Sequence, residues 1–193
     1  MKKDIILAGV GGQGILSIAA IIGTAAVDLG MYLKQAEVHG MSQRGGDVQS
    51  HLRISDDEIS SDLIPFGKAD MIISVEPMES LRYLPYLMPK GWVVTNTKPF
   101  INIPNYPDQN KLNSEIDRLP YHIAINADDV AKELDAPKSA NMVILGAASP
   151  FLGISFEKIE DAIRKIFGKK GDDVVMVNIK ALRAGKEFAE KNM

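Results

Sequence analysis

The feature that most constrains the fold of this chain is a glycine-rich run placed directly after a short apolar segment. Residues 4–9, DIILAG, form a continuous apolar run typical of a strand that is buried on both faces of a parallel sheet. The run GVGGQG follows at residues 9–14, and residues 13–29 have the pattern of a helix that is apolar around most of its circumference. This order predicts a strand, a tight loop and a buried helix at the start of an α/β sheet.

The glycine-rich run matches the GxGxxG pattern of nucleotide-binding strand–helix junctions. In that pattern Gly9 permits the tight turn, Gly11 lets the backbone approach a ligand, and Gly14 lets the helix pack closely on the strand. Backbone N–H groups at the start of the helix favour an anion such as a phosphate. Glu37 follows Gly14 by 23 positions, about where a carboxylate that binds ribose is expected. The pattern alone leaves two hypotheses about equally open, a nucleotide site and a tight junction that binds no ligand.

The rest of the chain alternates strand patterns with helix patterns. We expect strands at residues 31–39, 48–54, 70–75, 92–96 and 122–126, and helices at residues 77–87, 128–134, 139–151 and 156–167, with a last helix that begins at Asp172 and Asp173. The period-two pattern of residues 48–54 indicates a half-exposed strand, antiparallel or at an edge. Residues 97–107 contain three prolines, which indicates an extended surface excursion. The alternation predicts a single domain over residues 1–193, a doubly wound, Rossmann-like, mostly parallel α/β sheet with helices on both faces.

Composition excludes several classes of function. The 193 residues include no cysteine, so the chain can hold neither a disulfide nor, by itself, an iron–sulfur cluster or a thiolate zinc site. A net charge of −3 argues against bulk binding of nucleic acid. The longest apolar stretch, residues 15–27, is too short to span a membrane, and we therefore expect a cytoplasmic protein. The three histidines are not spaced as metal ligands, so no metal site is expected.

A second polar segment, residues 37–47, follows the second expected strand. Glu37 and His39 are two positions apart on that strand and point to the same face. Arg44 precedes two glycines, an arrangement suited to binding a carboxylate or phosphate. The alternative is a solvated loop whose glycines serve a hairpin. The ligand hypothesis is favoured, because open α/β sheets bind ligands at the carboxyl ends of their strands.

Two further polar residues, Glu76 and Asn96, end neighbouring expected strands and should project near the same crevice. Glu76 and Glu79 are best interpreted as a buried helix cap and a solvated helix residue rather than as a catalytic pair of carboxylates. Residues 56–58, DDE, indicate a solvated turn.

Together, GVGGQG at residues 9–14 and EVHGMSQRGG at residues 37–46 resemble the gamma-type subunit of the 2-oxoacid:ferredoxin oxidoreductases, and most of all the beta subunit of the indolepyruvate type. The likeness continues in order and spacing over nearly the whole chain. It includes residues 63–65, 69–70, 76–79, 94–97, 141–146 and 178–185.

The resemblance implies a function that the residues alone do not establish. Such enzymes oxidatively decarboxylate a 2-oxoacid with coenzyme A, giving an acyl-CoA and carbon dioxide while they reduce ferredoxin. In the indolepyruvate type, thiamine diphosphate and the iron–sulfur clusters belong to a larger partner subunit, which agrees with the absence of cysteine here. The resemblance therefore implies an accessory subunit of an oxidoreductase, inactive alone, with coenzyme A as the candidate ligand because its pyrophosphate suits the glycine loop.

The residues expected to contact a ligand or another subunit come from both strings and from the two strand ends. They are Gly9, Gly11, Gly12, Gln13, Gly14, Glu37, His39, Ser42, Gln43, Arg44, Gly45, Gly46, Glu76 and Asn96. No catalytic role is assigned to any of them.

Two other functions remain as alternatives. A non-catalytic nucleotide-binding scaffold is supported by residues 97–107 and by the apolar character of residues 139–152, which could face a partner. An NAD(P)-dependent dehydrogenase is supported by the GxGxxG pattern and Glu37. A chain of 193 residues leaves little room for a separate substrate domain, however, and it lacks a Tyr-xxx-Lys proton relay.

Overall fold

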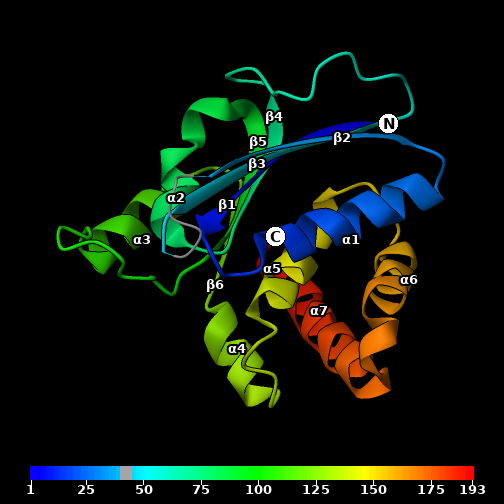
Figure 1. The fold of residues 1–193 in the computed structure, drawn as a ribbon. Helices are drawn as coiled ribbons and strands as arrows, with labels where there is room; N and C mark the ends of the chain where they lie inside the picture. Colours follow the sequence, from blue (N-terminus) through cyan, green and yellow to red (C-terminus); the bar gives the residue numbers. More distant parts are fainter. Residues whose placement is uncertain (40–44) are drawn as a thin grey trace.

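The computed structural model describes residues 1–39 and 45–193, in which six strands form one sheet in the order β2-β3-β1-β4-β5-β6 (Figure 1). The strands are β1 (Lys2–Val10), β2 (Tyr32–His39), β3 (Asp47–Ser55), β4 (Ala69–Ser74), β5 (Leu87–Asn96) and β6 (His122–Ile125). Strands β1, β4, β5 and β6 pair in parallel, and β3 runs antiparallel between β1 and β2. The predicted mostly parallel sheet is confirmed.

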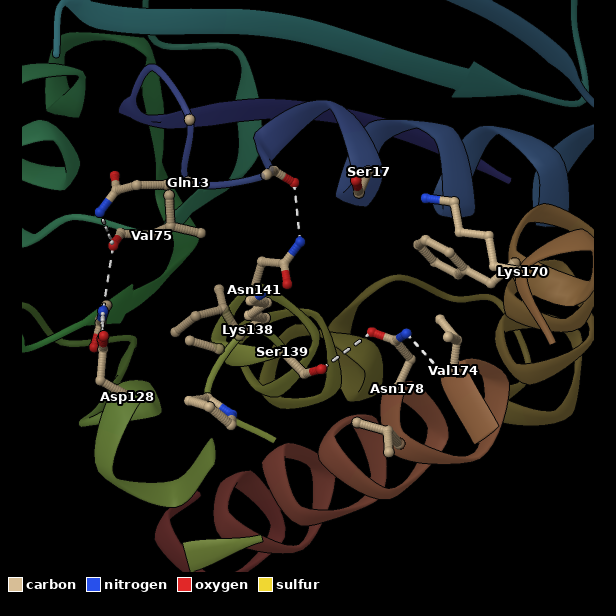
Figure 2. Close-up of a pocket in the computed structure, with 18 of the residues that line it drawn as sticks. Gln13, Ser17, Val75, Asp128, Lys138, Ser139, Asn141, Lys170, Val174 and Asn178 are labelled. Atoms are coloured by element: carbon tan, nitrogen blue, oxygen red, sulfur yellow. Dashed lines mark hydrogen bonds between the residues drawn. The ribbon is translucent and has the colours of Figure 1, made fainter. Parts of the chain in front are cut away.

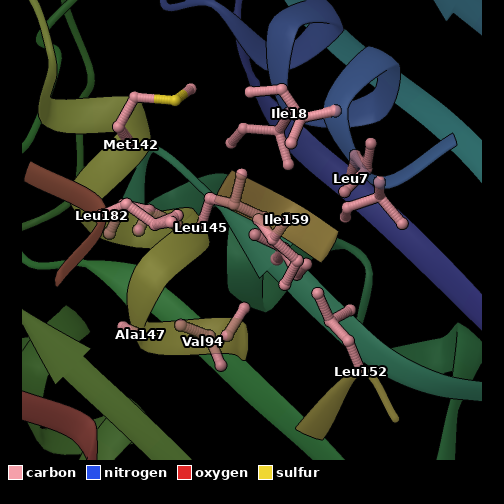
Figure 3. Close-up of a cluster of buried hydrophobic side chains, with 14 of the residues drawn as sticks. Leu7, Ile18, Val94, Met142, Leu145, Ala147, Leu152, Ile159 and Leu182 are labelled. Carbon is pink, nitrogen blue, oxygen red and sulfur yellow. The ribbon is translucent and has the colours of Figure 1, made fainter. Parts of the chain in front are cut away.

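Helices cover both faces of this sheet, as predicted (Figure 1). The helices are α1 (Ile15–Asp28), α2 (Pro77–Arg82), α3 (Gln109–Asp117), α4 (Ala127–Glu133), α5 (Ala140–Ala148), α6 (Phe156–Phe167) and α7 (Asp172–Asn192). Alternate residues of β1 belong to two separate cores, because successive strand side chains point to opposite faces. Ile5 and Leu7 pack in the core that includes α1 and α5–α7, where Figure 3 shows Leu7. Ile6 and Ala8 pack with the segments around α2.

One expected helix is shorter than predicted, and one helix of the structure was not predicted. The helix expected at residues 77–87 ends at Arg82, is followed by a short 3-10 turn at Leu84–Tyr86, and gives way to β5 at Leu87. Pro85 explains the early end, because proline has no N–H to donate to the carbonyl of Leu81 and its ring would clash with that carbonyl in a continued α-helix. Helix α3 is absent from the sequence prediction, since only Leu112 and Ile116 of its residues are buried.

Strand β3 is antiparallel as expected, but the prediction of a half-exposed strand is wrong. Gln49, Ser50 and His51 are all buried. The segment that follows β3 folds back over this face, and the N–H of Ile64 donates to His51 Nδ1 at 2.9 Å. The amide of Gln49 lies 2.8 Å from His51 Nε2. The polar side chains of the pattern are therefore covered by residues that lie outside the strand itself.

Helices α5 and α7 cross with their backbones in contact. A Cβ atom at Gly146 would lie 1.9 Å from the carbonyl oxygen of Leu182, and one at Gly185 would lie 1.9 Å from that of Val143. The crossing buries α5 in the main core (Figure 3). The apolar residues 139–152 are thus largely core, which removes one of the two supports for the scaffold alternative.

In the described part of the chain, no helix combines the length and apolar character needed to cross a membrane.

Replacing Gly146 with alanine is expected to lower the free energy of unfolding by about 2–3 kcal/mol, because the added methyl group forces the two helices apart. This loss outweighs the gain in helix propensity of about 1 kcal/mol. Urea unfolding followed by circular dichroism measures the change. The matched control is Gly168→Ala, where a Cβ atom meets nothing within 4 Å and the backbone φ is −54°. Equal stability of the Gly146→Ala variant and the wild type would contradict the close crossing.

His51 is expected to make stability depend on pH. Burial lowers the pKa of His51 below its ordinary value of 6.5, and a proton on Nδ1 would also face the Ile64 N–H donor. The unfolded chain therefore binds a proton more readily, so this contribution to stability is complete above pH 6.5 and is lost as the pH falls through the folded-state pKa. Urea unfolding between pH 5 and pH 8 should show a weaker pH dependence for His51→Gln. Parallel curves for the two proteins would refute this assignment.

Candidate functional site

The glycine loop joins β1 to α1 through tight backbone contacts. A Cβ atom at Gly9 would lie 2.4 Å from Val75 Cγ2 and 2.9 Å from Ile15 Cδ1, so Gly9 serves close packing of the strand rather than the turn. The turn itself uses Gly12 (φ +102°) and Gly14 (φ +82°), which adopt backbone geometry that favours glycine. Gly14 also packs closely, but its neighbour is Asn141 of α5 rather than the strand.

The two segments singled out in the sequence lie against each other. The N–H of Gly11 donates to the carbonyl of Gly46 at 2.8 Å, and the N–H of Gly45 donates to the carbonyl of Gly11 at 3.4 Å. The close backbone approach expected at Gly11 is thus made by residues 45–46 of the chain itself. A phosphate at this loop would then depend on the amides from Gly14 onward, at the start of α1.

Gln13 fixes the shape of the loop from inside. Its Oε1 accepts from the N–H of Val10 at 2.8 Å, and its Nε2 donates to the carbonyl of Val75 at 3.4 Å. One side chain thus ties the loop to the carboxyl end of β4.

A groove of about 780 Å³ opens beside the glycine loop (Figure 2). Gln13 and Asp128 lie at one end of the view and Lys170 at the other. The walls come from the start of α1, the carboxyl ends of β4 and β5, the α4–α5 connection and α7. The polar residues that line the groove are Gln13, Ser17, Asn96, Asp128, Lys138, Ser139, Asn141, Lys170, Asp173 and Asn178.

Most of the polar wall is held by internal hydrogen bonds (Figure 2). Asn141 Nδ2 donates to the carbonyl of Gly14 at 3.2 Å, and Ser139 Oγ donates to Asn178 Oδ1 at 3.3 Å. Asn96 Nδ2 donates to Asp128 Oδ2 at 2.8 Å. Among the described lining residues there is no histidine or other evident base beside a nucleophile. The groove is suited to binding, and it shows no arrangement for covalent catalysis.

Glu76 lies outside the groove, on the turn between β4 and α2, and forms a separate buried cluster. Its carboxylate is fully buried and caps α2, because Oε2 accepts from the N–H of Glu79 at 2.9 Å. Oε1 accepts from the N–H of Phe100 at 3.3 Å and from the hydroxyl of Tyr106. The expectation of a buried cap is confirmed, and the cap also binds the segment after β5.

The expectation that Glu79 is solvated is wrong. Its side chain is 1% exposed and pairs with Arg82, whose Nε donates to Glu79 Oε2 at 2.8 Å. Burial raises the pKa of Glu79, while the hydrogen bond from Arg82 opposes the rise. Burial is also the main cause that raises the pKa of Tyr83 to about 12. Tyr106, half-buried beside Glu76, likewise has a raised pKa. Both hydroxyls therefore remain protonated at neutral pH and act as hydrogen-bond donors.

Glu37 does not join either cluster. It is exposed on β2, and β3 separates β2 from β1, so Glu37 stands two strand spacings, roughly 10 Å, from the strand that bears the glycine loop. The side chain of His39 and residues 40–44, which include Ser42, Gln43 and Arg44, lie outside the described residues. The structure thus brings together the glycine loop, residues 45–46 and Asn96, but not Glu37.

Several groove residues have no signal in the sequence. Lys138, Ser139 and Lys170 stand in no recognisable motif, and Asn141 and Asn178 appear only within stretches that carry the family resemblance. The two asparagines come together because α5 and α7 cross at Gly146 and Gly185.

Glu76→Gln is expected to lower the free energy of unfolding by about 2 kcal/mol and to speed thermolysin cleavage within residues 97–107. The reason is that the carboxylate oxygens of Glu76 accept hydrogen bonds from the N–H groups of Glu79 and Phe100. In the variant, the NH₂ group of the glutamine would face one of these donors and could not accept from it. Mass spectrometry of timed digests locates the cuts. The control variant Glu115→Gln makes the same chemical change at an exposed position, and thermolysin should cleave it at the same rate as the wild type. Unchanged cleavage in Glu76→Gln would show that Glu76 does not hold this segment.

Comparison with known proteins gives concordant matches. The family model described as pyruvate ferredoxin/flavodoxin oxidoreductase matches residues 4–188. Indolepyruvate oxidoreductase subunit IorB of Thermococcus kodakarensis is 38% identical, over 99% of this chain and 98% of that protein.

Two solved structures share the fold. The gamma subunit of a keto/oxoacid ferredoxin oxidoreductase from Geobacter sulfurreducens has a TM-score of 0.71 and 25% identity, over 98% of this chain and 99% of that one. The 2-oxoglutarate:ferredoxin oxidoreductase of Magnetococcus marinus, solved with 2-oxoglutarate, coenzyme A and succinyl-CoA bound, has a TM-score of 0.78 and 24% identity. The match covers 98% of this chain and 31% of that longer one.

Proposed function

Because the chain belongs to the pyruvate ferredoxin/flavodoxin oxidoreductase family, we propose that it is the accessory subunit of an indolepyruvate-type 2-oxoacid:ferredoxin oxidoreductase. The observation that carries this proposal is the end-to-end likeness to a protein named as one subunit of an indolepyruvate oxidoreductase. The complete enzyme would oxidatively decarboxylate an aryl pyruvate with coenzyme A, giving an acyl-CoA and carbon dioxide, and would reduce ferredoxin. Residues 1–193 would form one gamma-type domain of this cytoplasmic complex.

The proposal assigns different roles to the two subunits. Iron–sulfur clusters require cysteine ligands, and this chain has none, so its residues do not fit a cluster. The groove offers amides, hydroxyls, lysines and aspartates but, among the described lining residues, no evident base beside a nucleophile. The larger partner would therefore carry the clusters and thiamine diphosphate and pass the electrons to ferredoxin.

Coenzyme A is the ligand that we propose for the groove. Its pyrophosphate is an anion of the kind that the start of a helix favours, and the groove begins at the start of α1. Lys138 and Lys170 line the same groove and supply positive charge. A volume of about 780 Å³ lies within the usual range of ligand sites. The chain would hold and orient this ligand, and the partner would supply the group that is transferred.

The geometry argues against a self-contained NAD(P)-dependent dehydrogenase. In dinucleotide-binding folds the acidic residue that binds ribose follows the strand beside the glycine loop. Here an antiparallel strand occupies that place, and Glu37 is exposed one strand further out.

The purified chain alone is expected to reduce no ferredoxin with indolepyruvate and coenzyme A. Adding its purified large subunit should produce reduction that saturates at a fixed molar ratio of the two. Ferredoxin reduction is followed by absorbance, and omission of coenzyme A is the control. The proposal fails if the lone chain turns over a 2-oxoacid, or if the large subunit is equally active without it.

NADH titration of the lone chain should leave the nucleotide fluorescence unchanged.

A further inference from the structure

The segment between β5 and α3, residues 97–107, which we call the apolar loop, exposes three large apolar side chains. Ile101 is 73% exposed, Phe100 is 44% exposed and Ile103 is 41% exposed. Single exposed apolar residues are ordinary on protein surfaces, but three within four positions form a local patch of the kind that marks an interaction site. Figure 1 shows this segment in green, at the side of the molecule where α3 lies.

The backbone of the apolar loop is fixed, although it contains no helix or strand. Glu76, fully buried, accepts from the N–H of Phe100 and from the hydroxyl of Tyr106. Asn102 Nδ2 donates to the carbonyl of Gly45 at 2.8 Å. The N–H of Lys98 donates to Asn96 Oδ1 at 3.2 Å. Hydrogen bonds thus hold the start, the middle and the end of the loop.

Such anchoring has a consequence for binding. A loop that is already ordered loses little conformational entropy when a partner covers it, so more of the burial energy appears as affinity. The three prolines of the loop limit its freedom further. The molecule therefore uses a buried carboxylate to present apolar side chains to solvent, an arrangement that stability alone does not require.

The position of the apolar loop connects it to the site. It leaves the sheet at the carboxyl end of β5, and through Asn102 it contacts Gly45, whose neighbour Gly46 pairs with Gly11 of the glycine loop. A protein that covered the apolar loop would stand beside the glycine loop as well. The segment between β3 and β4 also exposes a large apolar side chain, that of Phe66. Among the described contacts, this segment has no such connection to the site.

We propose that Phe100, Ile101 and Ile103 form the docking surface for an apolar patch on the larger subunit. This inference rests on the proposed function, which makes the chain one part of a heteromer. The Magnetococcus marinus enzyme supports this choice of occupant, because there the same fold occupies about a third of one longer chain and is covalently joined to the rest of that chain. Burial of the three side chains beside the glycine loop would join the ligand groove to the partner that carries the chemistry.

The test measures the affinity of the full chain for its purified large subunit by isothermal titration calorimetry. Ile101→Lys should raise the Kd about 30-fold, the effect of losing an interface hot spot. Val27→Lys is the matched control, because Val27 is 54% exposed at the far end of α1, near the opposite edge of the sheet. It should change the Kd less than twofold. Both side chains are solvent-exposed, so both variants should melt within a few degrees of the wild type.

The outcomes separate this inference from the proposed function. If the wild-type chain binds the large subunit and completes its activity, but Ile101→Lys binds as tightly as Val27→Lys, the docking surface is refuted and the proposed function stands. If the wild-type chain does not bind the large subunit at all, the proposed function is refuted, and the docking surface is refuted with it. If the wild-type chain is a dimer by light scattering and Ile101→Lys is a monomer, the occupant is a second copy and the inference is wrong.

Discussion

The close approach of β1, β4 and α1 at Gly9 is the constraint on which the rest of the site depends. There is no room for a Cβ atom at this position, because Val75 Cγ2 would lie only 2.4 Å away. The contact sets the carboxyl end of β4 against the end of β1 and the start of α1, so that one side chain, Gln13, can bind backbone groups at the ends of β1 and β4. Gly14 then turns the chain into α1 at a point where only a hydrogen atom fits beside Asn141. The groove takes its shape from these contacts.

The same junction explains why two glycine-rich segments occur in one small chain. The N–H of Gly11 donates to the carbonyl of Gly46, and the carbonyl of Gly11 accepts from the N–H of Gly45. Part of the nucleotide-like pattern therefore joins two loops rather than binding a ligand. Asn102 extends this set of contacts to the loop after β5, and the buried Glu76 holds that loop in place. A chain of contacts thus links the groove, the junction of the two loops and the exposed apolar side chains. An arrangement of this kind suits a subunit that completes another protein's site.

The sequence predicts the central strands and the outer helices well, because residues 4–9 and 70–75 can be buried on both faces only in the middle of a sheet. The sequence predicts the burial of a side chain less well where residues outside its own helix or strand cover it. His51 is covered by the segment that contains Ile64, and Glu79 is buried although its place on a short helix predicts solvent exposure. Asn141 and Asn178 of the groove are brought together by the crossing of α5 and α7, a contact between helices that no local pattern encodes. Glu37 has the right spacing along the chain, but the insertion of β3 between β1 and β2 moves it away from the glycine loop.

The central claim is that this cysteine-free chain shapes and completes a redox enzyme whose electron-carrying groups belong to another subunit. The most direct measurement is the iron and thiamine content of the two subunits after an active complex has been separated under anaerobic, native conditions. The account predicts that all the iron and all the thiamine diphosphate stay with the larger subunit, and that the complex regains its absorbance and activity when the two are recombined. Stoichiometric iron or thiamine diphosphate on the separated small chain would contradict it.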